Sequence, residues 1–416
     1  MKQLLIILLL LIGLPNVAQQ SISLEECYIL VTENYPLAKQ AKLLDTQNKL
    51  DLEVISTSKL PQLSLDAQAT YQSDVIEFPL AISGIEPLNK DQYRATVSVN
   101  QLIYNGGATD ASLDLKSAQL KTKQKQIEVS LYQLKQQINQ LYFSVLLTQE
   151  SQLLLKAKQS QLKAKLGEVQ SGIKYGVILP TSDKVLEAEL LKINQQFNEL
   201  ESNKAMLIET LSSLISQPLH ASTTFQKPLL EIRLQTEIVR PELELFQFKK
   251  EEIENSVSLL SKQNTPKLLG FATGGYGNPG LNMLDNSFQT FYTVGVKVNW
   301  TVFDWNANKK QRASLAISKD FVENETEIFR LNTNIALNQQ QKEIDKIEAF
   351  ITSDLEIINL RKEVLKSADS QLKNGVITSS AYITELTNLY EDENTMVKHN
   401  IQLQLAKANY NVIKGQ

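Results

Sequence analysis

The sequence has few of the residues on which catalytic and metal sites depend. Its 416 residues include one cysteine, Cys27, and two histidines, His220 and His399. A lone cysteine cannot form a disulfide within the chain, and neither histidine has a second histidine or a cysteine at ligand spacing. We therefore expect no enzyme activity, no cofactor and no metal site. Glycine and proline are also scarce, with 15 and 11 residues, which is typical of a mainly helical chain.

Strong charge and long apolar runs are scarce as well. The net charge is −4, which argues against a nucleic-acid partner because such proteins carry basic surfaces. An apolar run from Leu4 to Leu14 follows Lys2 and is too short to span a bilayer as a helix. We interpret residues 1–18 as a signal peptide and expect the mature protein to be exported. No later segment has 18 consecutive apolar residues, which predicts that no helix spans a membrane.

The second half of the chain repeats the first half at a nearly constant distance. Residues 97–107 (VSVNQLIYNGG) correspond to 296–306 (VKVNWTVFDWN), and 174–178 (KYGVI) correspond to 373–377 (KNGVI), each 199 positions later. A repeat of this length indicates a duplicated architectural unit. We therefore predict a first repeat over 19–217, a linker over 218–236 and a second repeat over 237–416.

Each repeat contains two segments with the period of a β-strand. In the first repeat, residues 63–71 and 93–100 alternate apolar and polar side chains. Since successive side chains of a strand point to opposite faces, we expect one apolar and one polar face. The apolar face carries Leu65, Ala67, Val97 and Val99, and the polar face carries Asp66, Gln68, Thr96 and Ser98.

Long helices follow the strands. After Gly107 there is no proline until Pro180, and we predict one helix of about 65 residues, on the order of 100 Å long. Its apolar residues recur at an average spacing of about 3.5, which indicates a left-handed coiled coil. The turn at Gly176 reverses the chain, so this helix and the next are expected to form an antiparallel hairpin. The second repeat is expected to do the same around Gly375.

The predicted strands cannot form a complete structure alone. Four strands do not close a barrel, and an open sheet in a membrane would leave unpaired edges, so several copies must combine. Aromatic residues lie on or beside the strands: Tyr71, Tyr93, Tyr276, Phe291, Tyr292 and Trp300. They suit the aromatic girdle of a membrane barrel, and they would also suit the core of a soluble sandwich. The helices favour the barrel, because no single core requires helices of this length.

These features together resemble the TolC-like outer-membrane efflux protein family over essentially the whole mature chain. The resemblance rests on the duplicated helix, the strand entries Pro61-Gln62-Leu63 and Pro266-Lys267-Leu268, the strand-to-helix junctions and the Gly-Val turns. It implies a mainly α fold with a membrane β-barrel portion, in which a homotrimer forms a twelve-stranded barrel in the cell outer membrane. It also implies an α-helical tunnel in the periplasm, engaged by a periplasmic adaptor (membrane fusion) protein and an inner-membrane pump.

The resemblance gives the two strand faces different surroundings. On this interpretation the apolar set, Leu65, Ala67, Val97 and Val99, contacts outer-membrane lipid. The polar set, Asp66, Gln68, Thr96 and Ser98, faces a water-filled lumen.

The turns of the two hairpins are the predicted docking site for the adaptor. Each turn has the sequence Gly-Val-Ile, and the Val-Ile pair offers an apolar contact that a solvated tip does not need. The alternative is that both side chains pack on their own helix ends. The residues concerned are Gly176, Val177, Ile178, Gly375, Val376 and Ile377.

A periplasmic gate is less clearly marked. Members of the family that resemble its best-known type close the periplasmic end with acidic rings six and nine residues after the glycine of the second turn. This chain has Ala381 and Thr384 at those positions. The nearby carboxylates, Asp183 and Glu385, are therefore only candidate gate residues.

Two functions are consistent with these features. The first is a passive export conduit, the outer-membrane channel of a tripartite efflux or type I secretion system. The second is a periplasmic coiled-coil scaffold or adaptor whose strands form a small soluble domain. Retention in the outer membrane after a carbonate wash would distinguish the first from the second.

Overall fold

The computed structural model describes residues 21–76, 86–232 and 237–416. The predicted signal peptide, residues 1–18, lies outside the described residues. The chain divides into two compact units, and each unit draws on both sequence repeats. Unit 1 comprises the described parts of 1–40, 127–241 and 328–416, and unit 2 comprises those of 41–126 and 242–327.

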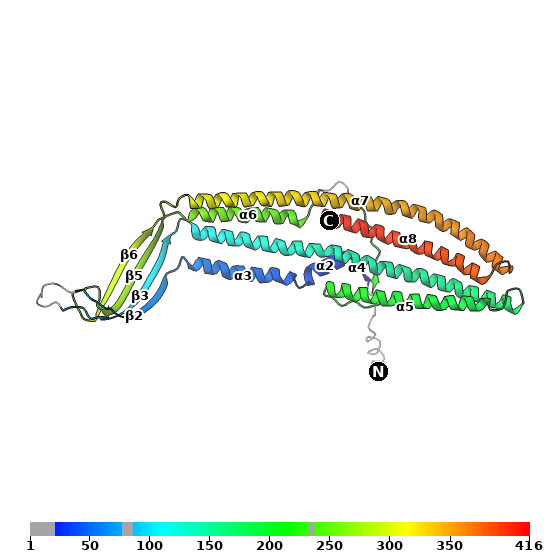
Figure 1. The fold of residues 1–416 in the computed structure, drawn as a ribbon, viewed down its shortest axis with the longest axis horizontal. Helices are drawn as coiled ribbons and strands as arrows, with labels where there is room; N and C mark the ends of the chain where they lie inside the picture. The colour runs from blue at the N-terminus through cyan, green and yellow to red at the C-terminus, as the bar shows by residue number, and fades with distance from the viewer. Residues whose placement is uncertain (1–20, 77–85, 233–236) are drawn as a thin grey trace, which may run out of the picture. The chain divides into compact units, whose positions relative to one another are not determined.

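Helices make up most of the described chain and match the predicted segments closely (Figure 1). The two longest, α4 and α7, have 67 residues each, which confirms the prediction that both repeats keep the same length here. The helices are α2 (Leu24–Asn34), α3 (Ala38–Thr57), α4 (Ala108–Lys174), α5 (Ser182–Leu214), α6 (Pro241–Lys262), α7 (Ala307–Lys373) and α8 (Ser379–Lys414).

Local sequence signals explain where several of these helices begin. The Ser23 hydroxyl accepts a hydrogen bond from the Glu26 backbone N–H at 3.2 Å, and the Glu26 carboxylate accepts one from the Ser23 N–H at 2.7 Å. This reciprocal capping box satisfies two N–H groups that α2 leaves unpaired at its start. Pro241 begins α6, where its missing N–H costs no helical hydrogen bond.

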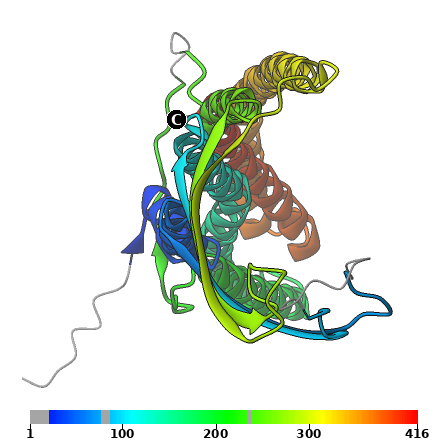
Figure 2. The ribbon, with the colours of Figure 1, turned by 90° about the vertical axis from the view of Figure 1, so that its left-hand side faces the viewer.

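The strands of unit 2 form a four-stranded antiparallel sheet in the order β2-β3-β5-β6 (Figure 2). They are β2 (Gln62–Tyr71), β3 (Asp91–Tyr104), β5 (Lys267–Asn278) and β6 (Gln289–Asn299). The β2-β3 hairpin of the first repeat therefore pairs with the β5-β6 hairpin of the second repeat through β3 and β5. Strand β6 ends at Asn299, and an irregular segment leads into α7.

Unit 1 contains the main buried core, and a short sheet that the sequence did not predict. Strands β1 (Ser21–Ile22) and β4 (Thr224–Phe225) pair in parallel. The Tyr142 hydroxyl of α4 donates to the carbonyl of Ile22 or Gln226, at 3.0 and 2.7 Å. Tyr142 is fully buried and packs edge-on against Phe225. One side chain thus ties both short strands to α4.

Cys27 lies in this core and is fully buried. Burial, with a smaller contribution from the negative charge of Glu26, raises the pKa of its thiol to about 12. A thiol with this pKa stays protonated at neutral pH and does not react readily. Cys27 is a buried, unpaired residue of α2.

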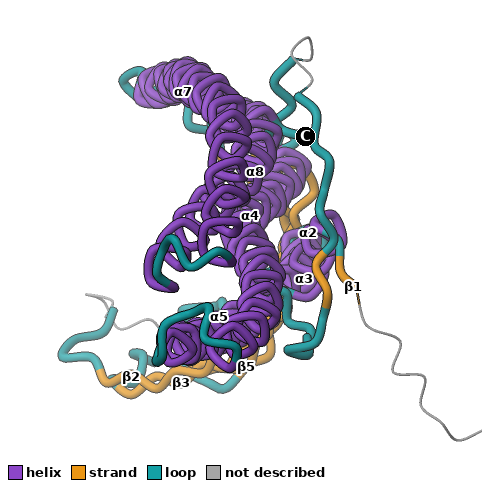
Figure 3. The backbone as a smooth tube through the Cα atoms, turned by 90° about the vertical axis from the view of Figure 1, so that its right-hand side faces the viewer, coloured by secondary structure: helices purple, strands orange, loops and turns teal. Residues whose placement is uncertain are grey.

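A second core lies where the two hairpins of unit 1 meet near their turns (Figure 3). Leucines of α4 recur every seven residues at Leu155 and Leu162, followed by Val169, and all three are buried. Leu186 and Ile193 of α5 and Tyr382 and Leu386 of α8 pack into the same cluster, with residues of α7. The predicted coiled-coil packing of each hairpin therefore extends across both hairpins.

The strand-to-helix junction of the first repeat depends on two consecutive glycines in the left-handed region. Gly106 has φ of 65°, and a Cβ at this position would lie 1.9 Å from Thr265 Oγ1. Gly107 has φ of 83° and no heavy atom within 4 Å of such a Cβ. Both positions favour glycine because their φ angles are positive. Only at Gly106 would a Cβ also overlap a neighbouring side chain, that of Thr265.

We expect Gly106→Ala to destabilise the protein by about 2 to 4 kcal/mol, because it adds a steric overlap to backbone strain. The matched Gly107→Ala variant should cost only about 1 to 2 kcal/mol of strain. Thermal unfolding of the purified protein in detergent measures both. Equal losses in the two variants would contradict this account of the junction.

Candidate functional site

The register of the sheet places the two predicted residue sets on opposite faces. Leu65 pairs with Val97, and Asp66 pairs with Thr96. Directly paired residues of antiparallel strands project to the same face, so each predicted set occupies one face. The apolar face continues onto β6 through Val294, Val296 and Val298. The sheet therefore has one apolar side and one side rich in polar residues.

From residue 93 to residue 98 of β3, exposure is the reverse of what a soluble protein shows, and every residue of β2 is exposed. The side chains of Leu65 and Val97 are 75% and 44% exposed, whereas Thr96 and Ser98 are half-buried. No described helix of unit 2 lies over either face of the sheet (Figures 1 and 2). Within the described part of the chain, the apolar face is therefore largely bare.

Most of the aromatic residues singled out in the sequence lie on the apolar face. The register places Tyr71, Tyr93, Tyr276 and Tyr292 there. Phe291 lies on the other face, opposite Gly275, and Phe271 lies on that face opposite Gly295. Each ring occupies the space that its paired glycine leaves free. A Cβ added to Gly275 would lie 2.5 Å from Phe291 Cζ, and a Cβ added to Gly295 would lie 2.7 Å from Phe271 Cζ.

Both hairpin turns have the same hydrogen-bond pattern. Gly176 and Gly375 have φ of 75° and 69°. The Val177 N–H donates to the Gly172 carbonyl at 2.9 Å, and the Val376 N–H donates to the Gln371 carbonyl at 2.9 Å. This is the Schellman motif, in which a glycine ends the helix and the next N–H reaches back to satisfy an unpaired carbonyl.

The Val-Ile pair of each turn divides into one packed and one exposed residue. Ile178 packs back against Gly172 of α4, and both Ile178 and Ile377 join the core between the hairpins. Val177 and Val376 are 56% and 71% exposed. Packing on the helix ends thus accounts for the isoleucines and leaves the valines at the surface.

Charged groups connect the hairpins just before the turns. Lys165 of α4, whose side chain is buried, forms ion pairs with Glu168 and with Asp369 of α7. Lys373 also pairs with Asp369, at 3.0 Å. The Lys165 ammonium lies 5.4 Å from the centroid of the Tyr382 ring of α8. This cluster joins three helices beside a groove of about 220 Å³ that Val177 and Ile178 help to line.

The two candidate gate carboxylates pair with different cations. Asp183 lies on α5 with Lys184 Nζ at 3.5 Å, and Glu385 lies on α8 with Arg361 Nη1 at 3.7 Å. Arg361 also bonds Asp392 at 2.9 Å. Each carboxylate has its own cationic neighbour, and their gating role stays a prediction.

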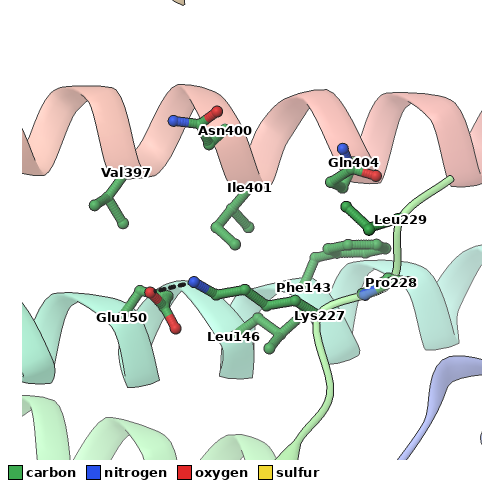
Figure 4. Close-up of a pocket in the computed structure, with 10 residues that line it drawn as sticks. All are labelled: Phe143, Leu146, Glu150, Lys227, Pro228, Leu229, Val397, Asn400, Ile401 and Gln404. Atoms are coloured by element: carbon green, nitrogen blue, oxygen red, sulfur yellow. Dashed lines mark hydrogen bonds and ion pairs between the residues drawn. The ribbon is translucent and has the colours of Figure 1, made fainter.

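A separate pocket of about 280 Å³ lies between α4, α8 and residues 227–229 (Figure 4). Phe143, Leu146 and Ile401 supply apolar walls. The charged side chains that line it, Lys227 and Glu150, bond each other at 2.6 Å. Because these charges are satisfied internally, the pocket does not offer an obvious site for a charged ligand.

No helix in the described parts of the chain is both long and apolar enough to cross a membrane.

Comparison with known proteins identifies the fold. No protein-family model and no curated protein matches the sequence. Among solved structures, the outer membrane protein VceC from Vibrio cholerae matches with a TM-score of 0.67 at 13% identity, covering 94% of this chain and 96% of that one. The Campylobacter jejuni CmeC outer membrane channel matches with a TM-score of 0.67 at 15% identity, and the match covers 94% of this chain and 85% of that one. The open state of the Neisseria gonorrhoeae MtrE outer membrane channel matches with a TM-score of 0.66 at 13% identity, and the match covers 94% of this chain and 89% of that one.

The chain has the fold of the TolC-like outer-membrane channels. This confirms the predicted resemblance and the mainly α fold with antiparallel strands. These neighbours are described as outer-membrane proteins or channels and not as enzymes.

Sequence reasoning missed the charged cluster near the turns, although the sequence contains a signal for it. Lys158 and Lys165 are seven residues apart and share the period of Leu155 and Leu162. Both lysines are buried, and both bond a carboxylate. Lysines that share the heptad period of a coiled-coil core indicate buried ion pairs.

The cluster predicts a pH-dependent contribution to stability. Burial alone would raise the pKa of Asp369, but hydrogen bonds from Lys165 and Lys373 outweigh it and lower that pKa. A carboxylate with a lowered pKa stabilises the fold fully above its unfolded value of about 4, and this contribution is lost as the pH falls through the lower folded value. Asp369→Asn should therefore cost about 1 kcal/mol at pH 7 and progressively less as the pH falls below about 4.

Thermal midpoints of both proteins between pH 2 and 7 test this prediction. Glu343→Gln is a matched control, because Glu343 forms an exposed pair with Lys346 on the same helix and should change little at any pH. A difference between wild type and Asp369→Asn that does not vary with pH would contradict the assignment.

Proposed function

We propose that this chain is the outer-membrane channel of a tripartite efflux or type I secretion system, a passive export conduit in the cell outer membrane. The observation that carries the proposal is the bare apolar face of the sheet. Burying apolar surface is the main favourable term in folding, so a face such as Leu65 and Val97 needs a cover. Lipid is the cover that suits a sheet whose opposite face is polar.

The edges of the sheet support closure by several copies. In this chain β2 and β6 are the two edge strands, and unpaired edges are not tolerated in lipid. The four strands alternate in direction, so β6 of one copy and β2 of the next would run antiparallel and could pair like the others. Eight strands enclose only a space that side chains fill, whereas three copies give twelve strands and room for a conduit.

The helices support the same assembly. In unit 1, α7 exposes apolar residues at spacings of three, four and seven that fall on one side of the helix: Ile328, Leu331, Ile335, Ile357, Leu360 and Val364. A second copy of the chain, with the same helices, would cover this stripe. We propose that the hairpins of three copies line a tunnel in the periplasm.

The exposed valines of the turns are the proposed contact with a periplasmic adaptor, which would connect the conduit to an inner-membrane pump. Val177 and Val376 remain exposed after the isoleucines have packed. The Cβ that Gly375 lacks would lie 2.9 Å from the Val177 carbonyl oxygen, so the two turns touch. They present a paired apolar surface at the end of the hairpins.

Fractionation tests the conduit against the alternative of a periplasmic scaffold. A conduit stays in the outer-membrane fraction after carbonate extraction, and the purified protein gives conductance steps in a planar bilayer. A soluble scaffold is released by carbonate and conducts nothing. Cross-linking of the membrane-bound protein should give a trimer.

The two faces of the sheet give a one-residue test. Arginine at Val97 should cost about 2 to 4 kcal/mol if this position is at mid-bilayer, because the apolar face would carry a charge into lipid. Arginine at the adjacent Ser98 should be tolerated and should alter conductance. Equal sensitivity to urea of the two folded variants would refute the assignment of the faces.

The turns give a second test. Replacing Val177 and Val376 with aspartate should abolish export and leave trimer assembly and membrane insertion intact, because both side chains are at the surface. Replacement with leucine keeps an apolar contact and should preserve export. Ile178→Asp should instead destabilise the hairpin end. An aspartate double variant that exports normally, or one that no longer forms trimers, would count against docking.

A further inference from the structure

One cation on the polar face of the sheet has an unusual setting. The Arg94 guanidinium carbon lies 5.5 Å from the centroid of the Phe291 ring. No hydrogen bond or ion pair joins Arg94 to another residue among those the structure describes. A guanidinium has five N–H donors in a planar fork, so these donors are available to a ligand.

The ring beside Arg94 is held in place by the sheet. Phe291 pairs directly with Gly275, and a Cβ on Gly275 would lie 2.5 Å from Phe291 Cζ and 2.9 Å from the Ala95 carbonyl oxygen. The ring therefore lies along the strands in the space over the glycine, an arrangement that fixes aromatic residues on sheets. The guanidinium and the ring form a preorganised pair of half-buried groups.

The rest of this face is hydroxyl-rich and carries a cationic excess. Ser98 Oγ and Thr273 Oγ1 are 3.0 Å apart, and Ser64 and Thr293 continue the same row across β2 and β6. Lys267 and Lys297 share the face with Arg94, and Asp66 is the carboxylate there. An anion that enters this side meets more positive than negative charge.

We propose that Arg94 and Phe291 form a binding step for aromatic anions, such as aryl sulfonates and aryl carboxylates, on the inner face of the conduit. The anionic group accepts two hydrogen bonds from the guanidinium, and the ligand ring packs beside Phe291. This inference rests on the proposed function, since it takes the polar face as the lumen. An aliphatic anion would gain the charge contact alone.

Current block of the purified full-length protein in a planar bilayer tests the proposal. Naphthalene-2-sulfonate, added from the side of the strand loops, should block the current at lower concentration than methanesulfonate. Arg94→Gln should raise the blocking concentration of naphthalene-2-sulfonate about tenfold, since hydrogen bonds to a charged group are lost. Phe291→Leu, which keeps apolar volume, should raise it about threefold.

Lys297→Gln is the matched control. Lys297 lies on the same face and carries the same charge, but it forms no cation–π contact among the described residues. Its loss should shift the reversal potential in a KCl gradient as Arg94→Gln does and change naphthalene-2-sulfonate block by less than about twofold. Arg94→Lys keeps the charge and loses the planar set of N–H donors, so its blocking concentration should lie between those of the wild type and Arg94→Gln. This variant replaces Arg94→Gln in the test if Arg94→Gln does not assemble.

Three results would overturn the proposal. They are equal loss of block in Arg94→Gln and Lys297→Gln, unchanged block in Phe291→Leu, and a conducting wild type that naphthalene-2-sulfonate does not block. Each of these leaves the conduit itself intact. A wild-type protein that forms no pore would overturn the conduit and the binding step together.

Discussion

The exposed apolar face and the free edges of one four-stranded sheet constrain everything else in this protein. Leu65 and Val97 are open to solvent in the single chain, and β2 and β6 end the sheet on either side. Water is a poor solvent for the face, and lipid is a poor environment for the edges. A closed ring of several copies in a membrane, as proposed above, would satisfy both requirements.

The repeated plan of the chain gives it a geometry that such a ring could use. Each repeat contributes one hairpin, and the hairpins join through β3 and β5. The resulting even number of alternating strands lets identical copies continue the antiparallel pattern. The repeated helices α4 and α7 have equal lengths, so their turns fall at equivalent places and can touch, as Gly375 and Val177 do.

Much of the fold was predictable because its signals are periodic or local. Alternation set the strand faces, heptad spacing set the hairpins, and Ser23 and Gly176 marked a helix start and a helix end. The missed features depend on partners that are distant in sequence. The pairing of β1 with β4 needs residues about two hundred positions apart, and the Arg94–Phe291 contact depends on a glycine in a third strand, β5.

The turns show why the same motif can serve both stability and contact. A Schellman turn directs the residue after its glycine to bond the helix through its backbone, which leaves the side chain of that residue free to point away. In both repeats this residue is a valine, and the following isoleucine returns to the core. The backbone and the isoleucine thus hold each turn, so the valine surface can change without loss of the fold. A surface that is independent of folding in this way can be selected for its partner alone.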